Sequence, residues 1–421
     1  MLDIKFIREN PDKVKEGAKN KGVAVDIDRL LEVDKKRREI SQALDDMRAQ
    51  KNKSSKEFPR IEDEEEKKKI VLEMRELDTN SDRLEKELKE LDEELNKLMS
   101  AIPNVPQEGV PVGKNDSENV VMKEVGEKTK FDFEPRNYLD IAENLDIIDI
   151  ERAAKIAGTR FGFLKREAAL LEFALVNFAF DKLLKEEFIP IIPPVIIKPE
   201  MAWGMGFLEQ SNDEEAYHLE KDNLYLTATA EQSLGTMHSN EIFEAKDLTR
   251  RYMGFSTCFR REAGAYGKDT KGIFRVHQFD KIEMFSYSKP EDSGKEHEFL
   301  LSMEEKLMQD LDIPYRVVRI CTGDLGVPAA SKYDIEAWIP SEKRYRETHS
   351  TSNCTDFQAR RLNIRYRDKD GKLNFTHTLN GTALAIGRTL IAIIENYQQK
   401  DGSIKVPDVL QKYLGIKTIK R

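Results

Sequence analysis

Acidic residues lie inside apolar stretches at three places in the second half of the chain. Glu283 occurs in HQFDKIEMF, Glu231 in LTATAEQ, and Glu262 in FRREAG, which follows the apolar run YMGFSTCF. A carboxylate in an apolar environment is costly unless it is paired or hydrogen-bonded, and a single one is usually part of a structural ion pair. Three of them in three predicted strands indicate a polar sheet face that could bind a cationic group, a metal or a polar substrate.

Alternation along a strand predicts which of these side chains lie together. Successive side chains point to opposite faces, so Arg260 and Glu262 are expected on one face and Arg261 on the other. A solvated strand end would explain the charges of FRREAG equally well. The same rule predicts two further groups that share a face, namely Thr227, Thr229 and Glu231, and Phe279, Lys281 and Glu283.

Basic residues accompany these carboxylates. EAGAYGKDTKGIFR (262–275) combines glycines with Lys268, Lys271 and Arg275, which is typical of a mobile loop that closes over an anionic ligand, although an ordinary hairpin loop has the same composition. THTLNGTALAIGRTLIAIIENYQ predicts a polar strand, a tight Asn-Gly turn and an apolar helix. Arg388 in that helix is a poor surface residue, and we expect its guanidinium to reach a phosphate or a carboxylate.

The elements that must position these residues lie mainly after residue 116. Many short β runs follow one another there with few helices between them, which predicts an antiparallel sheet flanked by helices, an α+β arrangement. AIPNVPQEGVPVGKND (101–116) is rich in proline and glycine and predicts a linker. Neither a Walker phosphate loop nor a GxGxxG turn is present, so a nucleotide would bind to side chains of the sheet.

The first hundred residues have a different pattern. An apolar heptad series starts at Ile70, and Phe58-Pro59 separates it from an earlier helical stretch. Proline cannot continue a preceding helix, so we expect an antiparallel hairpin of two long helices. The heptad residues are Ile70, Met74, Leu77, Leu84, Leu88, Leu91, Leu95, Leu98 and Ile102, with Ser81 as the one polar break.

The two predicted helices of this hairpin carry opposite charges. Residues 35–60 contain nine Lys or Arg against four Asp or Glu, and residues 61–100 contain eight against fifteen. Either the two helices pair charge to charge, or the first helix offers a basic face to a polyanion. The candidate polyanion-binding residues are Lys36, Arg38, Arg48, Lys53 and Lys56.

Length and composition narrow the class of protein. A chain of 421 residues predicts two domains, and its net charge of −9 gives no sign of nucleic-acid binding by the whole molecule. Cys258, Cys321 and Cys354 lack metal-ligand spacing, so neither structural zinc nor a disulfide framework is expected. The N-terminus has no signal-peptide pattern, and no apolar run approaches the ~20 residues of a membrane span. We therefore expect a cytoplasmic protein.

These motifs, in this order, resemble the seryl-tRNA synthetase family of class II aminoacyl-tRNA synthetases. The resemblance covers the chain from MLDIKFIRENPDKV through TAE (229–231), FRREAGAYGKDTKGIFRVHQFDKIE (259–283), SNCTDFQARR (352–361) and LNGTALAIGR (379–388) to DGSIKVPDVLQKYLG (401–415). It implies an N-terminal tRNA-binding coiled-coil arm over residues 1–102, a linker over 103–116 and a class II catalytic domain over 117–421.

The resemblance also implies roles for single residues. Arg260 is similar to the arginine that holds the α-phosphate of ATP, and Glu262 to the residue that reads the adenine amino group. The implied ATP-binding set is Arg260, Arg261, Glu262, Arg275, Val276, Phe279, Glu347, Thr348, His349, Ser350 and Arg388, of which Arg260, Arg275 and Arg388 would be catalytic. The implied serine-binding set is Thr229, Ala230, Glu231, Arg260, Glu283, Asn380 and Thr382. Glu347 and Ser350 would bind Mg²⁺.

The implied activity is that of a serine–tRNA ligase. L-Serine and ATP would give seryl-adenylate and pyrophosphate, and serine would then pass to the 3′ end of tRNA(Ser), and of tRNA(Sec) as well. EFIPIIPPVIIKPEMAWGMG resembles the motif that forms the homodimer interface in this family. Two alternatives remain open: a paralogue that charges a carrier protein, and a non-catalytic coiled-coil interaction protein.

One segment departs from the family pattern. Where the family commonly has EISSCSNC, this chain has ETHSTSNC, so Thr348, His349 and Thr351 replace Ile, Ser and Cys. Glu347 and Ser350 are retained, and the metal site is therefore expected to remain. A charged His349 near Mg²⁺ would be unfavourable, which predicts that activity falls more steeply below about pH 6.5 than in enzymes that carry serine at this position. His297, on a charged helix, is expected at the surface.

Overall fold

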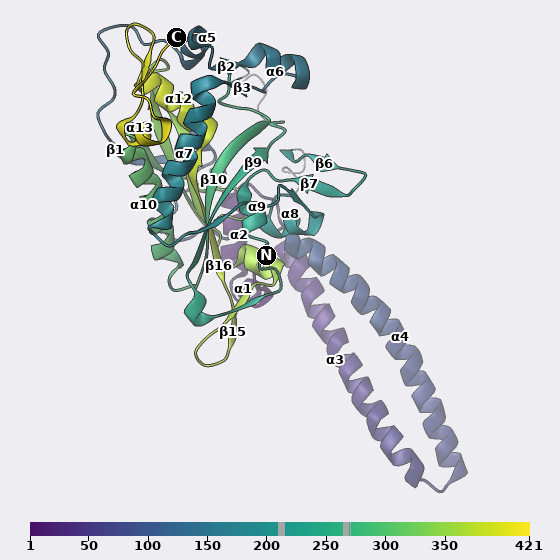
Figure 1. The fold of residues 1–421 in the computed structure, drawn as a ribbon. Helices are drawn as coiled ribbons and strands as arrows, with labels where there is room; N and C mark the ends of the chain where they lie inside the picture. Colours follow the sequence, from purple (N-terminus) through teal and green to yellow (C-terminus); the bar gives the residue numbers. More distant parts are fainter. Residues whose placement is uncertain (209–214, 264–268, 270) are drawn as a thin grey trace. The chain divides into compact units, whose positions relative to one another are not determined.

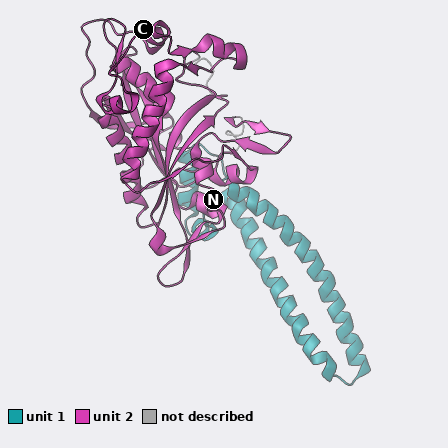
Figure 2. Cartoon of the chain, in the orientation of Figure 1, with its two compact units in different colours: residues 1–103 teal, residues 104–421 magenta. Residues whose placement is uncertain are grey.

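The computed structural model describes residues 1–208, 215–263, 269 and 271–421. The chain separates into two compact units, residues 1–103 and residues 104–421 (Figure 2). Unit 1 is helical, and its elements are α1 (Ile4–Glu9), α2 (Pro11–Asn20), α3 (Ile27–Glu57), the 3₁₀ turn η1 (Phe58–Arg60) and α4 (Glu64–Ser100) (Figure 1).

Helices α3 and α4 form the predicted antiparallel hairpin. Asp26 caps α3 by accepting a hydrogen bond from the Arg29 amide, and Asp63 caps α4 by accepting one from the Glu65 amide. Pro59 lies in η1, directly after the end of α3, as the sequence predicts. The heptad residues of α4 are buried or half-buried while most residues between them are exposed, which confirms the predicted seam.

Unit 2 contains an eight-stranded sheet in the order β1-β11-β12-β13-β16-β10-β9-β4. Its neighbouring strands are antiparallel except β4 and β9, so the predicted antiparallel sheet is confirmed with one parallel edge strand. The strands of this sheet are β1 (Val120–Val125), β4 (Ile189–Ile191), β9 (Arg250–Phe259), β10 (Gln278–Ser288), β11 (Tyr315–Arg319), β12 (Ser331–Ile339), β13 (Arg344–Asn353) and β16 (His377–Ala385).

Helices cover the sheet, as Figure 1 shows for α7, α10 and α12. The main core includes buried residues of these helices and of the central strands, such as Leu175, Leu300, Ile391 and Met284. The helices of unit 2 are α5 (Tyr138–Leu145), α6 (Ile150–Ala157), α7 (Arg166–Leu184), α8 (Pro199–Met205), α9 (Ala230–Leu234), α10 (Ser293–Asp310), α11 (Phe357–Leu362), α12 (Ile386–Asn396) and α13 (Asp408–Leu414), with 3₁₀ turns η2 (Asp116–Glu118), η4 (Ala245–Asp247) and η5 (Thr322–Asp324).

Short strands form small sheets beside the main one. They are β2 (Ile148–Asp149) with β3 (Phe163–Leu164); β5 (Ile196–Ile197), β7 (Leu224–Leu226) and β6 (His218–Leu219); β15 (Leu373–Phe375), β14 (Arg365–Arg367) and β8 (Ile242–Glu244); and β17 (Ile404–Lys405) with β18 (Thr418–Ile419). Residues 104–116 of the predicted linker belong to unit 2 and hydrogen-bond to other segments of it. The Asn104 amide donates to the Val327 carbonyl at 3.0 Å, and the Gln107 amide donates to the Ala330 carbonyl at 2.8 Å.

Two local predictions are wrong. LTATAEQ was expected to be a strand, but β7 ends at Leu226, and Thr229 is the N-cap of helix α9, which carries Glu231 in its first turn. The Asn-Gly pair was expected to form a tight turn, but Asn380 and Gly381 lie in the middle of β16, which continues to Ala385.

Candidate active site

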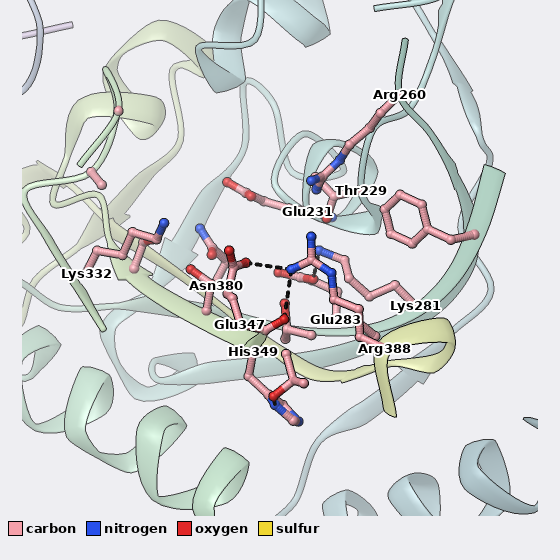
Figure 3. Close-up of a pocket in the computed structure, with 18 of the residues that line it drawn as sticks. Thr229, Glu231, Arg260, Lys281, Glu283, Lys332, Glu347, His349, Asn380 and Arg388 are labelled. Carbon is pink, nitrogen blue, oxygen red and sulfur yellow. Dashed lines mark hydrogen bonds and ion pairs between the residues drawn. The ribbon is translucent and has the colours of Figure 1, made fainter. Parts of the chain in front are cut away.

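A cavity of about 300 Å³ lies in unit 2, and its walls include residues of β10, β12, β13, β16, α9 and α12 and Arg260, which directly follows β9. Figure 3 labels ten of its residues, and the side chains of Glu231, Arg260, Glu283, Glu347 and Arg388 gather around one space. Thr229 and Glu231 come from the start of α9, and Lys281 and Glu283 from β10. The cavity thus collects the acidic residues that the sequence singles out.

Glu231 is held in place by neutral hydrogen bonds. Its amide donates to Thr229 Oγ1 at 3.2 Å, and its Oε1 accepts from Gln358 Nε2 at 3.0 Å. Gln358 in turn accepts from Thr378 Oγ1 at 2.6 Å. Burial and the charge of Glu283 raise the pKa of Glu231 to about 7. A cation in the cavity would shift this carboxyl group towards its ionised form.

Glu283 is buried next to a cation. Lys281 Nζ forms an ion pair with Glu283 Oε2, and the side chains of the two residues are 8% and 2% exposed. Their predicted face is correct, since both line the cavity together with Phe279. Thr382 in β16 is paired in register with Glu283 and also lines the cavity, as does Asn380.

The segment FRREAG begins where β9 ends, at Phe259. Arg260 and Glu262 both line the cavity, whereas Arg261, which the resemblance places in the ATP-binding set, is not among the lining residues. Glu262 has φ 52°, so this part of the chain is no longer extended and the predicted strand is shorter than expected. The Arg261 amide donates to the Glu215 carbonyl at 2.9 Å, outside the cavity lining.

Phe279 and Arg275 line the cavity next to Arg260 and Glu262. The Arg260 guanidinium carbon lies 5.2 Å from the centre of the Phe279 ring, and Arg275 Nη1 lies 2.6 Å from Glu262 Oε2. Val276 also lines the cavity. Residues 264–268 and 270 of the loop predicted to close over an anionic ligand, including Lys268, lie outside the described residues.

Opposite this wall, Arg388 at the start of α12 contacts Glu347 in β13. Arg388 Nη1 donates to Glu347 Oε1 at 3.0 Å and to its carbonyl oxygen at 3.1 Å, the contacts marked in Figure 3. Surrounding protein atoms alone would raise the pKa of Glu347, but the positive charges of Arg388 and Lys332 outweigh this effect and lower it to about 2. Glu347 is therefore an anion, and the prediction that Arg388 reaches a carboxylate is confirmed.

The chemistry of Glu347 and Ser350 fits a magnesium ion. A carboxylate and a hydroxyl supply hard oxygen donors, and Mg²⁺ commonly takes only one or two protein ligands together with substrate phosphates and water. Both residues line the cavity, and the side chain of Glu347 is 47% exposed to it. Within the described residues, no cluster of three or more His, Cys, Asp or Glu is arranged to hold a metal.

The three residues that depart from the family pattern are buried and hydrogen-bonded. Thr348 Oγ1 donates to the Ile335 carbonyl at 3.2 Å, and Thr351 Oγ1 donates to the Asn380 carbonyl at 2.8 Å. His349 Nδ1 lies 2.8 Å from Thr348 Oγ1, and burial lowers the pKa of His349 to about 4. The imidazole is therefore neutral at pH 6.5. The predicted fall in activity below that pH required a charged His349, so the structure does not support it.

His297 is another wrong prediction. It is 3% exposed, its Nε2 lies 3.1 Å from the Thr351 carbonyl oxygen, and burial lowers its pKa to about 4. The charged residues around it in the sequence suggested a surface helix, but His297 lies on the side of α10 that packs against the sheet.

Sequence reasoning missed the part played by Lys332 and Gln358. Lys332 lines the cavity and lies 3.5 Å from Asp334, measured from Nζ to Oδ1. Gln358 lies in α11, far from Glu231 in the sequence, so no local pattern could connect them. Ala230, predicted to bind serine, is 1% exposed at the start of α9, where only its backbone could contribute.

Several basic residues of α3 form ion pairs with acidic residues of α4. The long arginine and lysine side chains of α3 reach acidic residues of α4 along the length of the hairpin. The pairs are Arg29–Glu94 at 2.8 Å, Arg37–Asp92 at 2.5 Å, Arg48–Glu85 at 3.3 Å, and Lys51–Asp78.

The five predicted polyanion-binding residues therefore differ in availability. Lys36 and Arg38 pair with acidic residues one turn earlier in α3, and Arg48 pairs with α4. Lys53 and Lys56 are exposed and have no hydrogen bond or ion pair with any described residue. These two lysines remain free for an external anion.

Comparisons with known proteins agree with this geometry. The model of the seryl-tRNA synthetase N-terminal domain matches residues 1–106, and that of the tRNA synthetase class II core domain (G, H, P, S and T) matches residues 216–397. Similar proteins include the serine–tRNA ligases of Dictyoglomus turgidum and Treponema denticola, each 46% identical to this chain. The alignments cover all of this chain, 99% of the first relative and 100% of the second.

Solved structures give the same result. The chain is similar to seryl-tRNA synthetase from Pyrococcus horikoshii complexed with ATP, with a TM-score of 0.94 and 41% identity. It is also similar to the cytoplasmic serine–tRNA ligase from Naegleria fowleri in complex with AMP, with a TM-score of 0.89 and 36% identity. Both alignments cover 100% of this chain and 99% of the other. Among the described residues, no helix is long and apolar enough to cross a membrane.

Proposed function

This chain belongs to the seryl-tRNA synthetase family, and from that premise we propose how its residues perform serine–tRNA ligase chemistry. The chain is a serine–tRNA ligase that joins L-serine to tRNA with ATP. One observation carries the residue assignments. Carboxylates suited to an ammonium group and arginines suited to phosphates line a single cavity of about 300 Å³.

Serine binds beside β10 and α9 in this proposal. The ammonium group lies against Glu283 and Thr229, with Glu231 nearby, because buried carboxylates and a hydroxyl favour a cation. The serine hydroxyl is recognised by Asn380 and Thr382 of β16. Alanine would leave these buried polar groups unpaired, so the site can reject it without an editing step.

ATP lies next to serine in this proposal, between FRREAG, Phe279 and the start of α12. Glu262 reads the adenine amino group, and Phe279 stacks on the base. Arg260 holds the α-phosphate and the serine carboxylate, while Arg275 and Arg388 hold the outer phosphates. The contacts of Arg275 with Glu262 and of Arg388 with Glu347 keep these guanidinium groups at the cavity before ATP arrives.

Glu347 and Ser350 bind Mg²⁺ in this proposal, with Thr348 and His349 packed beside them. Bound there, the ion would supply positive charge to the phosphates. Glu347 suits this task because it is ionised over the whole physiological range. Arg388 occupies its carboxylate in the structure, so the guanidinium must turn from Glu347 towards phosphate when nucleotide and metal bind.

The first step is the attack of a serine carboxylate oxygen on the α-phosphorus of ATP. An O–P bond forms, the bond to the bridging oxygen breaks, and pyrophosphate leaves with the electron pair. Arg260 brings the two anions together, and the three arginines balance the charge of the transition state. In the second step, a hydroxyl of the terminal ribose of tRNA attacks the seryl carbonyl and AMP leaves.

The N-terminal unit, residues 1–102, supplies the contact with tRNA in this proposal. Lys53 and Lys56 support it, since they are exposed and unpaired among the described residues. The substrates would be tRNA(Ser) and also tRNA(Sec). A homodimer is proposed through α7 and the segment 187–206, and the exposed apolar side chains Leu170 and Phe173 of α7 (56% and 61%) support it.

The first test is ATP–pyrophosphate exchange with each amino acid in turn, with Mg²⁺ and without tRNA. Exchange with serine alone is the expected result. A carrier-charging paralogue would form the adenylate but transfer serine to no tRNA, and a coiled-coil interaction protein would give no exchange. Exchange with another amino acid would contradict the proposed serine pocket.

A further inference from the structure

The ion pair between Lys281 and Glu283 is not explained by the roles proposed above. Both side chains project from one face of β10 into the cavity, where Figure 3 shows them in contact. Glu283 Oε2 is buried and has no hydrogen-bond partner among the described residues, so Lys281 Nζ is the cation that balances it. A protein cation therefore lies on the carboxylate to which we assign the serine ammonium group.

We propose that Lys281 is an exchangeable counter-ion of the serine site. Its ammonium group neutralises Glu283 while the site is empty, and moves to the serine carboxylate when the serine ammonium group takes its place on Glu283. This inference rests on the proposed function, in which Glu283 receives that ammonium group. It makes Lys281 a residue that couples binding of the two charged ends of the amino acid.

Burial explains why the empty site needs such a counter-ion. A carboxylate removed from water without a partner is strongly destabilised, and Glu231 adds a second acidic group close by. On the β16 side, Glu283 is paired in register with Thr382, which is neutral, and its charge also raises the pKa of the buried Glu304. Without a charge on residue 281, the empty pocket would hold Glu283 with no cation bound to it.

The chemistry of lysine suits exchange. Its ammonium is a compact charge on a flexible four-carbon stem, so it can leave one carboxylate for another by rotation about its own bonds. The charge of Lys281 also affects a second acidic residue of the cavity, Glu231. Burial and Glu283 raise the pKa of Glu231, while Lys281 and Arg260 lower it, so both cations act on the same carboxyl group. Arg260 is the residue assigned to the serine carboxylate.

A second lysine of the cavity provides a matched comparison. Lys332 and Asp334 are also two residues apart on one strand, with Nζ and Oδ1 separated by 3.5 Å. Lys332 lines the same cavity, but the carboxylates that raise its pKa include Asp334 and Glu347, which are not among the residues assigned to serine. Substituting Lys332 therefore measures the effect of removing a positive charge from the cavity, and substituting Lys281 measures in addition the loss of the proposed exchange between carboxylates.

The test is isothermal titration calorimetry of the full-length protein with L-serine and with L-serinamide, in which a neutral amide replaces the carboxylate. In Lys281→Met, the dissociation constant for serine should rise about tenfold, the size of one lost charge-assisted contact. That for serinamide should stay the same or fall, because its ammonium group no longer displaces a lysine. Equal weakening of both ligands, or unchanged serine binding, would overturn the inference.

Three further variants complete the experiment. Lys281→Gln can still hydrogen-bond Glu283 and should give the same split between ligands if the methionine variant does not fold. Lys332→Met should change the affinity for both ligands by the same factor, and a split there would also overturn the inference. Glu283→Gln should abolish binding of both ligands, and binding retained in that variant would contradict the proposed function itself.

Discussion

A Cβ atom added to Gly381 of β16 would lie 3.1 Å from Oε1 of Glu304 in α10. It would also lie 3.2 Å from the buried Thr351 Oγ1. Helix α10 packs against β16 here, and the lack of a side chain at position 381 allows this approach. Since Gly381 stands between Asn380 and Thr382, the packing behind the strand fixes the two residues assigned to the serine hydroxyl.

Gly381→Ala is therefore expected to disturb both stability and serine recognition. Overpacking of a filled core costs ~1–3 kcal/mol, and a shift of β16 should raise the KM for serine several-fold with little change in the KM for ATP. Urea unfolding and pyrophosphate exchange measure the two effects. Gly294→Ala, in the first turn of α10 where an added Cβ meets nothing within 4 Å, is the control and should leave the KM for serine unchanged and stability unchanged or slightly higher.

The same residue illustrates what the sequence could not predict. An Asn-Gly pair is a strong local signal for a turn, and the requirement for glycine at position 381 comes instead from a helix some eighty residues earlier in the chain. His297 was misplaced for a similar reason, because its burial depends on the sheet behind α10. Such contacts between distant segments leave no periodic pattern.

Patterns with a strict period were predicted well. The alternation in β10 puts Lys281 and Glu283 on the cavity side and Met284 in the core, and the heptads of α4 mark the seam of the hairpin. Arg260 and Glu262 of FRREAG both line the cavity, although the strand that was expected to place them there ends at Phe259. The roles of the site residues came from family resemblance, since spacing alone indicated only a polar sheet face.

Glu304 gives a prediction for the pH dependence of stability. It is fully buried in the core, and burial followed by the charge of Asp334 raises its pKa well above the ordinary value of 4.5. The folded protein thus holds a proton that the unfolded chain releases at about pH 4.5, so folding is weakened as pH rises above that value. Glu304→Gln cannot ionise and should be more stable than the wild type at pH 8.

Thermal unfolding between pH 4.5 and 8 tests this expectation. The difference in melting temperature between Glu304→Gln and wild type should shrink as pH falls to 4.5, because residue 304 of the unfolded wild-type chain then becomes increasingly protonated. Glu298→Gln, an exposed substitution on the same helix, serves as the control and should show no such trend. A difference for Glu304→Gln that is independent of pH would refute the buried-proton explanation.

The proposed metal site makes a prediction about magnesium. Glu347→Gln removes the anionic donor but keeps the size of the side chain, so the Mg²⁺ concentration for half-maximal pyrophosphate exchange should rise about tenfold or more, a loss typical of one charged contact. Ser350→Ala should raise it less. Glu342→Gln, at an acidic residue just before β13, is the comparison and should leave the Mg²⁺ requirement unchanged. An unaltered requirement in Glu347→Gln would remove this residue from the metal site.

The last prediction separates free from paired charges on the helical hairpin. Lys53 and Lys56 are exposed without partners among the described residues, whereas Arg37 pairs with Asp92 and is half-buried between the helices. If the two lysines contact tRNA phosphates, Lys53→Ala with Lys56→Ala should weaken tRNA binding and reduce the slope of log affinity against log salt by up to about two. Pyrophosphate exchange without tRNA should not change. Arg37→Ala is the control, and it should leave the slope of log affinity against log salt unchanged while lowering the melting temperature of the hairpin. An unchanged slope in the variant that lacks both lysines would mean that tRNA binds through other residues.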